Sequence, residues 1–534
     1  MASAIPTNTM GASTTREMIR SKLMRWLREE AQTPVEWIEE DQSLTALGVD
    51  SLGVAAISCE LERETGKRLN PEVLFELENI RQIAEYLDRL PVASRPLEAP
   101  SSVEGRSTGL PAADRSEDHS TMGEAAEAPI GPVDPSATGA ALIEHYAQLN
   151  GRIRQLKQKN AYFFETPISK HDGVWVVAEG RRMLMLGSYE YLGLLDHPKL
   201  QAASRAALDT FGTGHHGARL LTGTTDLHKK LEAKLASFMG ADDALVFSSG
   251  YVTNLSTIST LVDRSCVVIG DAWNHASIVD GCRMSGADFW TFEHNNLDAL
   301  AQQLARAAGR RTLVVVDAVF SMDGDVIDLP GVVDLCKRHR ALLMVDEAHS
   351  LGVLGKTGHG IQEHFGLANG DIDVKMGTLS KTFASSGGFV AANDEIITFL
   401  RHHARGYIFS GALSNPQVAA ALAAVEVLEE EPECVTRLHE NRDYYVAGLR
   451  RLGFDIGHTT TPIVPIMTKN EAWTLEMTAR CRQMGLLVVP VAFPAVPINA
   501  PRLRTCISSL HGKRELDFAL NILAQAGRAT GLIQ

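Results

Sequence analysis

The 534-residue sequence lacks several features that mark other classes of protein. It contains no run of about 18 apolar residues, so we expect no membrane span. Its first residues have no basic region followed by an apolar run, which argues against a secretory signal. The formal net charge is −14, so there is no general electrostatic reason to expect a nucleic-acid partner.

Cysteine is scarce, and its seven positions include no Cys-x-x-Cys pair. An odd number of scattered cysteines argues against a disulfide framework and against a zinc site. We therefore expect reduced thiols, no metal site and a cytoplasmic protein.

Aromatic residues are absent from residues 91–140, which hold seven of the 21 prolines. Such a segment cannot bury enough apolar surface to offset its ordering entropy, so it predicts a disordered linker. A chain of this length also needs more than one hydrophobic core. We therefore expect a small unit at 14–90 and a large one at 141–534.

The small unit has the pattern of an all-α bundle of four helices. Ile19, Leu23 and Leu27 recur at helical spacing, and a last helix is expected from Asn79 to Leu90. Ser51 follows Asp50 at the start of an intervening helix, where a serine side chain is exposed. The alternative is that Ser51 is merely a helix cap.

The large unit alternates short apolar runs with amphipathic helices, which predicts an α/β fold with a largely parallel sheet. The expected strands are 244–247, 266–269, 312–316, 342–345 and 374–376, and one helix is expected at Asp226–Met239. We expect a large domain at about 190–425 and a smaller α/β domain at about 426–534. Strands of the smaller domain are expected at 463–466, 486–489 and 503–507.

Asp346 and His349 follow the apolar run at 341–345. The carboxyl ends of parallel strands are where ligand sites form in α/β folds. Asp346 could pair with a protonated pyridine nitrogen, and His349 could bond a ring hydroxyl. Both residues could equally cap neighbouring helices.

Lys381 lies among small polar residues at 377–388. A Schiff-base lysine needs such a setting, with hydroxyls and amides nearby for a phosphate. Thr378 is a natural phosphate ligand, although Lys381 could also be a solvated loop lysine.

Residues 247–254 predict a strand that turns into a helix, where Ser249, Gly250 and Tyr251 could bind an anion. His275 could stack on a flat cofactor ring. A structural histidine is the alternative for His275.

Together these segments resemble the α-oxoamine synthases, which are pyridoxal-phosphate enzymes of fold type I. The resemblance runs from about residue 160 to the C-terminus. Its motifs are SYEYLGL (188–194), GARLLTGTTDLHKKLE (217–232), SSGYVTN, DAWNHASIVDG, FEHNN (292–296), VFSMDGD (319–325), VDEAHS, GTLSKTFASSGG and PRLRTCISSLHG (501–512).

This resemblance implies a role for each candidate residue. Lys381 would hold pyridoxal 5'-phosphate as a Schiff base, Asp346 would pair with its pyridine nitrogen, and His349 would contact its phenolic oxygen. The remaining roles are ring stacking for His275, phosphate binding for Thr378 and Ser249–Tyr251, and binding of the amino-acid carboxylate for Arg504, with Arg502 as the alternative.

Three departures from the family pattern affect the substrate and the assembly. Tyr189 and Glu190 stand where many relatives have asparagine, and Glu190 could repel a substrate carboxylate. His215 and His216 could reshape the entrance or the acyl site. The family's active sites lie at a homodimer interface, where a neighbouring subunit lends Ser-Thr to the phosphate; here only Ser410 of that pair remains.

The segment LTALGVDSLGVAAISCELERETGKRLNP resembles acyl or peptidyl carrier domains. It implies a 4'-phosphopantetheine arm on Ser51, a separate phosphopantetheinyl transferase to install it and an acyl-loading enzyme. A linker of about 50 residues would span roughly 40 Å, enough to deliver the arm in cis or in trans.

The expected reaction is a decarboxylative condensation of an amino acid with a carrier-bound acyl thioester, giving an α-amino ketone for natural-product biosynthesis. Two alternatives are an aminotransferase or racemase acting on a carrier-bound substrate, and a non-catalytic partner subunit. Retention of the candidate catalytic residues argues against the last.

Overall fold

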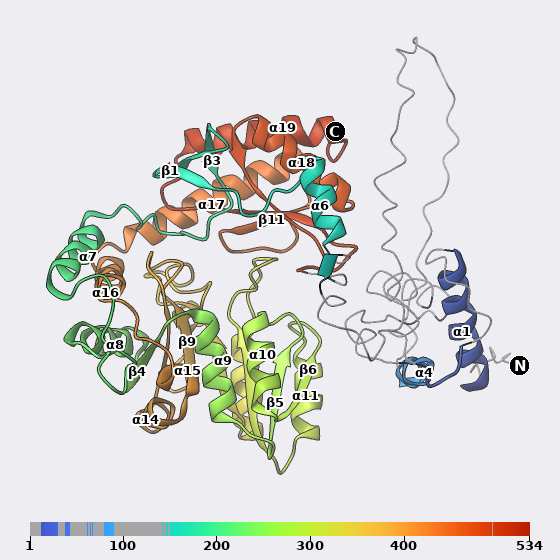
Figure 1. Cartoon of the computed structure of the whole chain (residues 1–534), viewed down its shortest axis with the longest axis horizontal. Helices are drawn as coiled ribbons and strands as arrows, with labels where there is room; N and C mark the ends of the chain where they lie inside the picture. The colour runs from blue at the N-terminus through green and yellow to red at the C-terminus, as the bar shows by residue number, and fades with distance from the viewer. Residues whose placement is uncertain are drawn as a thin grey trace, which may run out of the picture. The chain divides into compact units, whose positions relative to one another are not determined.

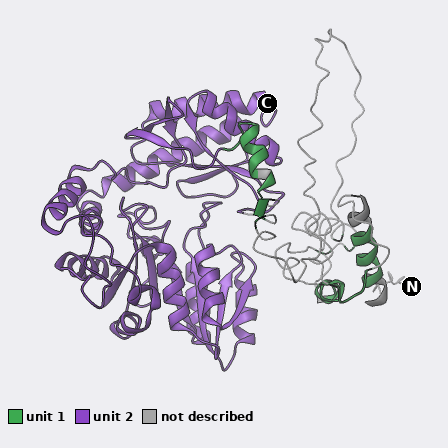
Figure 2. Ribbon diagram, viewed as in Figure 1, with its two compact units in different colours: residues 1–162 green, residues 163–534 purple. Residues whose placement is uncertain are grey.

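The computed structural model describes residues 12–29, 38–42, 61, 65, 67, 79–89, 143, 146–147, 150–493 and 495–534. The chain divides into two compact units, residues 1–162 and residues 163–534 (Figure 2). Ser51 and the predicted linker at 91–140 lie outside the described residues.

The first unit contains helices α1 (Ala12–Glu29), α4 (Ile80–Arg89) and α6 (Gly151–Gln158). Helices α1 and α4 pack together through buried apolar side chains: Ile19, Leu23, Ile80, Ile83 and Leu87. These two helices agree with the predicted spacing. The predicted total of four helices depends on residues outside the described ranges.

The second unit is built on a seven-stranded sheet with the order β4-β10-β9-β8-β7-β5-β6 (Figure 1). Its strands are β4 (Asp243–Phe247), β5 (Cys266–Asp271), β6 (Asp288–Phe292), β7 (Arg311–Asp317), β8 (Leu342–Asp346), β9 (Val374–Thr378) and β10 (Gly388–Ala392). Strands β6, β5, β7, β8 and β9 are parallel, as expected.

Strand β10 corrects the expectation, because it runs antiparallel to both β9 and β4 and makes the sheet mixed. Only residues 379–387 separate β9 from β10. A parallel crossover needs a dozen or more residues, so this short connection returns the chain antiparallel.

Helices cover both faces of this sheet. Leu313 and Val315 of β7 pack with α9 (Gly250–Leu261), α10 (Ala276–Ser285) and α14 (Asp394–His403). Val314 and Val316 belong to the core on the opposite face. Because both faces are buried, the strands are continuous apolar runs, and this made them recognisable in the sequence.

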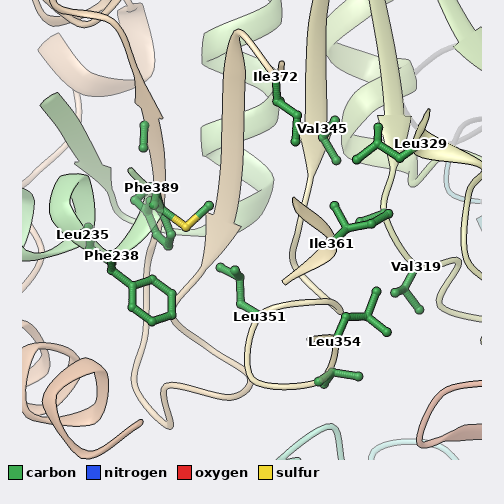
Figure 3. Packing of buried hydrophobic residues seen from close by; sticks show 14 of the residues in the cluster. Leu235, Phe238, Val319, Leu329, Val345, Leu351, Leu354, Ile361, Ile372 and Phe389 are labelled. Atoms are coloured by element: carbon green, nitrogen blue, oxygen red, sulfur yellow. The ribbon is translucent and has the colours of Figure 1, made fainter. Parts of the chain in front are cut away.

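The core on the opposite face joins side chains from distant segments (Figure 3). Phe238, Val345 and Phe389 come from helix α8, strand β8 and strand β10. Further helices of this unit are α7 (Pro198–Phe211), α8 (Asp226–Met239), α11 (Leu297–Arg306), α12 (Leu329–His339), α13 (Ile361–Phe365), α15 (Arg405–Ile408) and α16 (Asn415–Glu430). Helix α8 has the bounds predicted for it.

Two smaller sheets complete the unit. The first has the order β1-β2-β3-β12, with β1 (Ile168–Asp172), β2 (Trp175–Ala178), β3 (Arg181–Met185) and β12 (Leu486–Leu487). The second has the order β11-β14-β13, with β11 (Ile463–Met467), β14 (Arg502–Cys506) and β13 (Val489–Val491). Helices α17 (Glu433–Leu452), α18 (Glu471–Gln483) and α19 (Lys513–Thr530) pack beside them.

The single strand predicted at 486–489 is divided between these two sheets. Its first part, β12, pairs parallel with β3, whereas β13 pairs antiparallel with β14. An apolar run shows that a segment is buried, but its hydrogen-bonding partner depends on tertiary structure.

The cysteines in the described part of the chain number six, and all are free and buried. No helix in the described ranges is long and apolar enough to cross a membrane.

Candidate active site

A cavity of about 220 Å³ lies where β7, β8 and β9 end. It is lined by Ser249, Gly250, Tyr251, Asn254, His275, Ser277, Asp317, Ser321, Asp346, Ala348, His349, Met376, Thr378, Ser380 and Lys381. The structure therefore brings together every predicted cofactor residue except Ser410.

Lys381 lies just after β9, in the turn that leads to β10. Burial lowers the pKa of its amine to about 8, although the negative charges of Asp346 and Asp317 oppose that shift. Removing an ammonium from water penalises its charged form. Lys381 is therefore an amine that can give up its proton close to neutral pH.

Asp346 ends β8 and is held by two hydrogen bonds. The Asn254 side-chain amide donates to Asp346 Oδ2 at 2.6 Å, and the backbone N–H of Ala348 donates to Asp346 Oδ1 at 2.8 Å. Asn254 also donates to Ser277 Oγ at 2.9 Å, while its own Oδ1 is buried without a partner among the described residues. Asn254 lies in the SSGYVTN motif, but the sequence alone predicted no role for it.

Asp317 was also missed, although it ends an apolar strand as Asp346 does. Its Oδ2 accepts the backbone N–H of His275 at 2.7 Å. Burial raises the pKa of Asp317 well above its usual value, and the nearby Asp346 raises it further. Two adjacent buried carboxyl groups disfavour double ionisation, so burial and Asp346 together favour the protonated form of Asp317 more than in an isolated carboxyl group.

Two histidines face the cavity with fixed rings. His275 caps α10, and its Nδ1 lies 2.7 Å from Ser277 Oγ. Nδ1 of His349 lies 2.7 Å from the hydroxyl oxygen of Tyr191. Burial lowers the pKa of both imidazoles, well below the usual value for His349. Both rings are therefore neutral near pH 7.

The start of α9 and the end of β9 form an anion cradle. Ser249 Oγ caps α9 by accepting the N–H of Val252 at 3.1 Å. A Cβ atom on Gly250 would stand 3.0 Å from Thr378 Oγ1, so glycine permits this close approach. Unused N–H groups at a helix start, together with nearby hydroxyls, suit a phosphate.

Two arginines on β14 have different surroundings. Arg502 forms an ion pair with Asp323 and donates to Ala500 O at 3.0 Å. Arg504 donates through Nε to the carbonyl of Ser321, a cavity residue, at 2.6 Å. The charge of Arg502 is already matched, which favours Arg504 as the anion ligand.

The residues that depart from the family pattern lie outside the cavity lining. Ser410 follows α15, and Gly411 beside it is so close to His215 that a Cβ there would lie 2.5 Å from the imidazole. Glu190 Oε1 accepts the N–H of Leu195 at 3.2 Å, and burial raises the pKa of Glu190 to about 7. Tyr189 is exposed.

Two family models match the chain. Aminotransferase class I and II covers residues 181–523, and the phosphopantetheine attachment site covers residues 21–87. The 8-amino-7-oxononanoate synthase of Petrotoga mobilis is 37% identical over 394 residues, covering 73% of this chain and 100% of the relative. The serine palmitoyltransferase of Sphingobacterium spiritivorum is 39% identical over 369 residues, covering 69% and 92%.

Solved structures give the same grouping. The serine palmitoyltransferase of Sphingomonas wittichii matches with a TM-score of 0.72 and 32% identity, covering 74% of this chain and 100% of that one. A structure of SPT with a PLP internal aldimine also has a TM-score of 0.72, with 34% identity and coverage of 73% and 100%.

Proposed function

The chain belongs to the α-oxoamine synthases, which are pyridoxal-phosphate-dependent acyltransferases, and also carries a phosphopantetheine attachment domain; from this premise we propose that it condenses an amino acid with an acyl thioester on Ser51. One amino acid, one acyl thioester and one proton give one α-amino ketone, one carbon dioxide and one free thiol. The observation that carries the proposal is the single cavity that joins Lys381, Asp346, His275 and His349 in a chain with its own carrier domain.

The residues present fit pyridoxal phosphate. A buried carboxylate, Asp346, and the unpartnered Asn254 Oδ1 suit a ligand that presents an N–H group. The cradle at Gly250 and Thr378 suits its phosphate, and Lys381 supplies the amine. When bound, the cofactor stabilises negative charge that develops on the amino acid's α-carbon.

The side chains of the cavity then have separate tasks. Lys381, with its pKa lowered to about 8, takes the proton from the α-carbon. Asp346 would hold the ring nitrogen of the cofactor through its carboxylate, and His275 would lie against the ring. Arg504 binds the substrate carboxylate through its planar guanidinium.

The proposed acyl donor is the thioester carried on Ser51. Tethering an acyl thioester to Ser51 raises its effective concentration to about the millimolar range, without new contacts. A phosphopantetheinyl transferase installs the arm and another enzyme loads it. We propose a homodimer in which Ser410 of a second copy contributes to the phosphate site, and a role in natural-product assembly.

The test uses the full-length chain with its arm loaded by a panel of acyl groups. Release of carbon dioxide and an α-amino ketone of the expected mass supports the proposal, whereas an oxo acid without carbon dioxide indicates an aminotransferase. Ser51→Ala supplied with acyl-CoA is the matched control. Wild-type turnover by this variant would remove the carrier's role as donor.

A further inference from the structure

Tyr191 is a buried tyrosine whose hydroxyl reaches the active site. It belongs to the segment between β3 and α7, and its side chain is 0% exposed. Its hydroxyl oxygen lies 2.7 Å from Nδ1 of His349, a residue 158 positions away. The hydrogen-bonding partner of a candidate catalytic histidine is thus supplied by a segment outside the sheet.

The backbone of Tyr191 is fixed from the C-terminal side of the chain. The N–H of Ser509 donates to the Tyr191 carbonyl at 2.7 Å, and Ser509 Oγ donates to the Leu192 carbonyl at 2.7 Å. Because the carbonyls of both Tyr191 and Leu192 are held by Ser509, the Tyr191 ring has little freedom to move. The Tyr191 hydroxyl is therefore a preorganised group.

The surroundings of the hydroxyl determine which atom donates. Arg504 lies beside it, and a guanidinium can only donate hydrogen bonds. Burial raises the pKa of Tyr191, so its hydroxyl keeps its proton, while burial lowers the pKa of His349, so the imidazole is neutral. Because the guanidinium beside it cannot accept a hydrogen bond, the Tyr191 proton is directed to Nδ1 of His349. The ring proton of His349 then resides on Nε2.

We propose that Tyr191 is a positioning residue that fixes His349 as its Nε2–H tautomer, so that His349 donates a hydrogen bond into the cavity. The proposal rests on the proposed function and on the contact between His349 and the phenolic oxygen of the cofactor that the family resemblance implies. It also links His349 to Arg504, because one hydroxyl faces both side chains.

The first experiment compares Tyr191→Phe, His349→Asn and the double variant as full-length holoenzymes. Cofactor absorbance is titrated against pH with no acyl donor present, so condensation is not required. Loss of a donor to the phenolic oxygen makes the proton on the lysine–cofactor linkage harder to remove. The midpoint should rise by about 0.5 unit or more in each single variant, and the double variant should shift no further than His349→Asn alone.

Tyr445→Phe is the matched control. Tyr445 is equally buried, but its hydroxyl donates to Thr505 at 3.3 Å. This variant should lose comparable thermal stability while keeping the wild-type midpoint. A wild-type midpoint in Tyr191→Phe, or shifts that add fully in the double variant, would overturn the proposal.

Two further measurements distinguish a failure of this proposal from a failure of the proposed function. Borohydride reduction and peptide mapping locate the bound cofactor: label on another lysine overturns the proposed site and this proposal together. Label on Lys381 with an unshifted midpoint overturns this proposal alone. If Tyr191→Phe does not fold, NMR of the wild-type protein with ¹⁵N-labelled histidine decides, and a proton on Nδ1 of His349 contradicts the proposal.

Discussion

Asp317 and Asp346 are paired residues at the ends of the adjacent parallel strands β7 and β8. Both are buried, and both line the cavity that holds Lys381. Burial and the proximity of Asp346 raise the pKa of Asp317 well above its usual value. Their hydrogen-bond partners also differ, because Asp346 accepts from the Asn254 amide and Asp317 accepts from the backbone N–H of His275.

Replacing each aspartate by asparagine should separate the two roles. Asp346→Asn removes the charge opposite the ring nitrogen and should lower kcat/KM by about 100-fold or more. Asp317→Asn keeps an acceptor for the His275 N–H and should cost less than about fivefold, because burial already favours the neutral form of the carboxyl group that it replaces. Equal losses in steady-state assays of the two variants would contradict this assignment.

Lys381→Ala should abolish the covalent attachment of the cofactor and lower turnover by roughly 1,000-fold or more, because it removes both the attachment point and the base. Mass spectrometry after borohydride reduction measures the attachment. Lys375 is the internal control: it is a buried lysine on β9 that donates to Met239 O at 2.6 Å, and it should remain unlabelled. Turnover retained by Lys381→Ala would refute its role.

Arg504→Lys should raise the KM for the amino acid by about tenfold, since a lysine cannot make a bidentate pair with a carboxylate. Arg502→Lys should change KM much less, because Arg502 is already paired with Asp323. The main effect of Arg502→Lys should be a lower free energy of unfolding. Steady-state kinetics at varied amino-acid concentration compare the two variants. A larger KM change in Arg502→Lys would show that Arg502, and not Arg504, binds the substrate carboxylate.

His294 lies between two carboxylates, with Nδ1 3.0 Å from Asp271 and Nε2 2.6 Å from Asp325. Burial by itself lowers the pKa of His294, but the hydrogen bonds to Asp271 and Asp325 outweigh it and raise the pKa to about 9. A folded pKa above the unfolded value gives stability that is complete below about pH 6.5 and is lost as the pH rises through 9.

We therefore expect His294→Gln to lower the thermal unfolding midpoint most at pH 6 and least above pH 9.5. The loss in the free energy of unfolding at pH 6 should exceed the loss above pH 9.5 by roughly 2–3 kcal/mol. A destabilisation by His294→Gln that stays constant from pH 6 to 9.5 would show that its role is packing alone.

Several features could be predicted because they depend on neighbours in the sequence. The apolar runs of β5, β7 and β8 are buried on both faces, so their composition is sufficient to locate them. Helix α8 has an apolar face and a following glycine, and its predicted bounds are those observed. Asp346 and Lys381 follow such strands directly, which places them at one edge of the sheet.

Other features were decided only when the chain folded. The antiparallel direction of β10 and the division of residues 486–491 between two sheets depend on which strand is available as a partner. Asn254 reaches Asp346 across 92 positions, and Tyr191 reaches His349 across 158. Neither contact leaves a periodic signal in the sequence.

The sequence by itself therefore determined the buried parallel strands of the large unit, helix α8, the family and the two segments that carry Asp346 and Lys381. Tertiary structure decided which arginine is paired with Asp323, which aspartate has its pKa raised and which tyrosine contacts His349. The physical reason is that secondary structure follows from local spacing. Charge and tautomer depend on burial and on hydrogen bonds between segments that meet only in the folded protein.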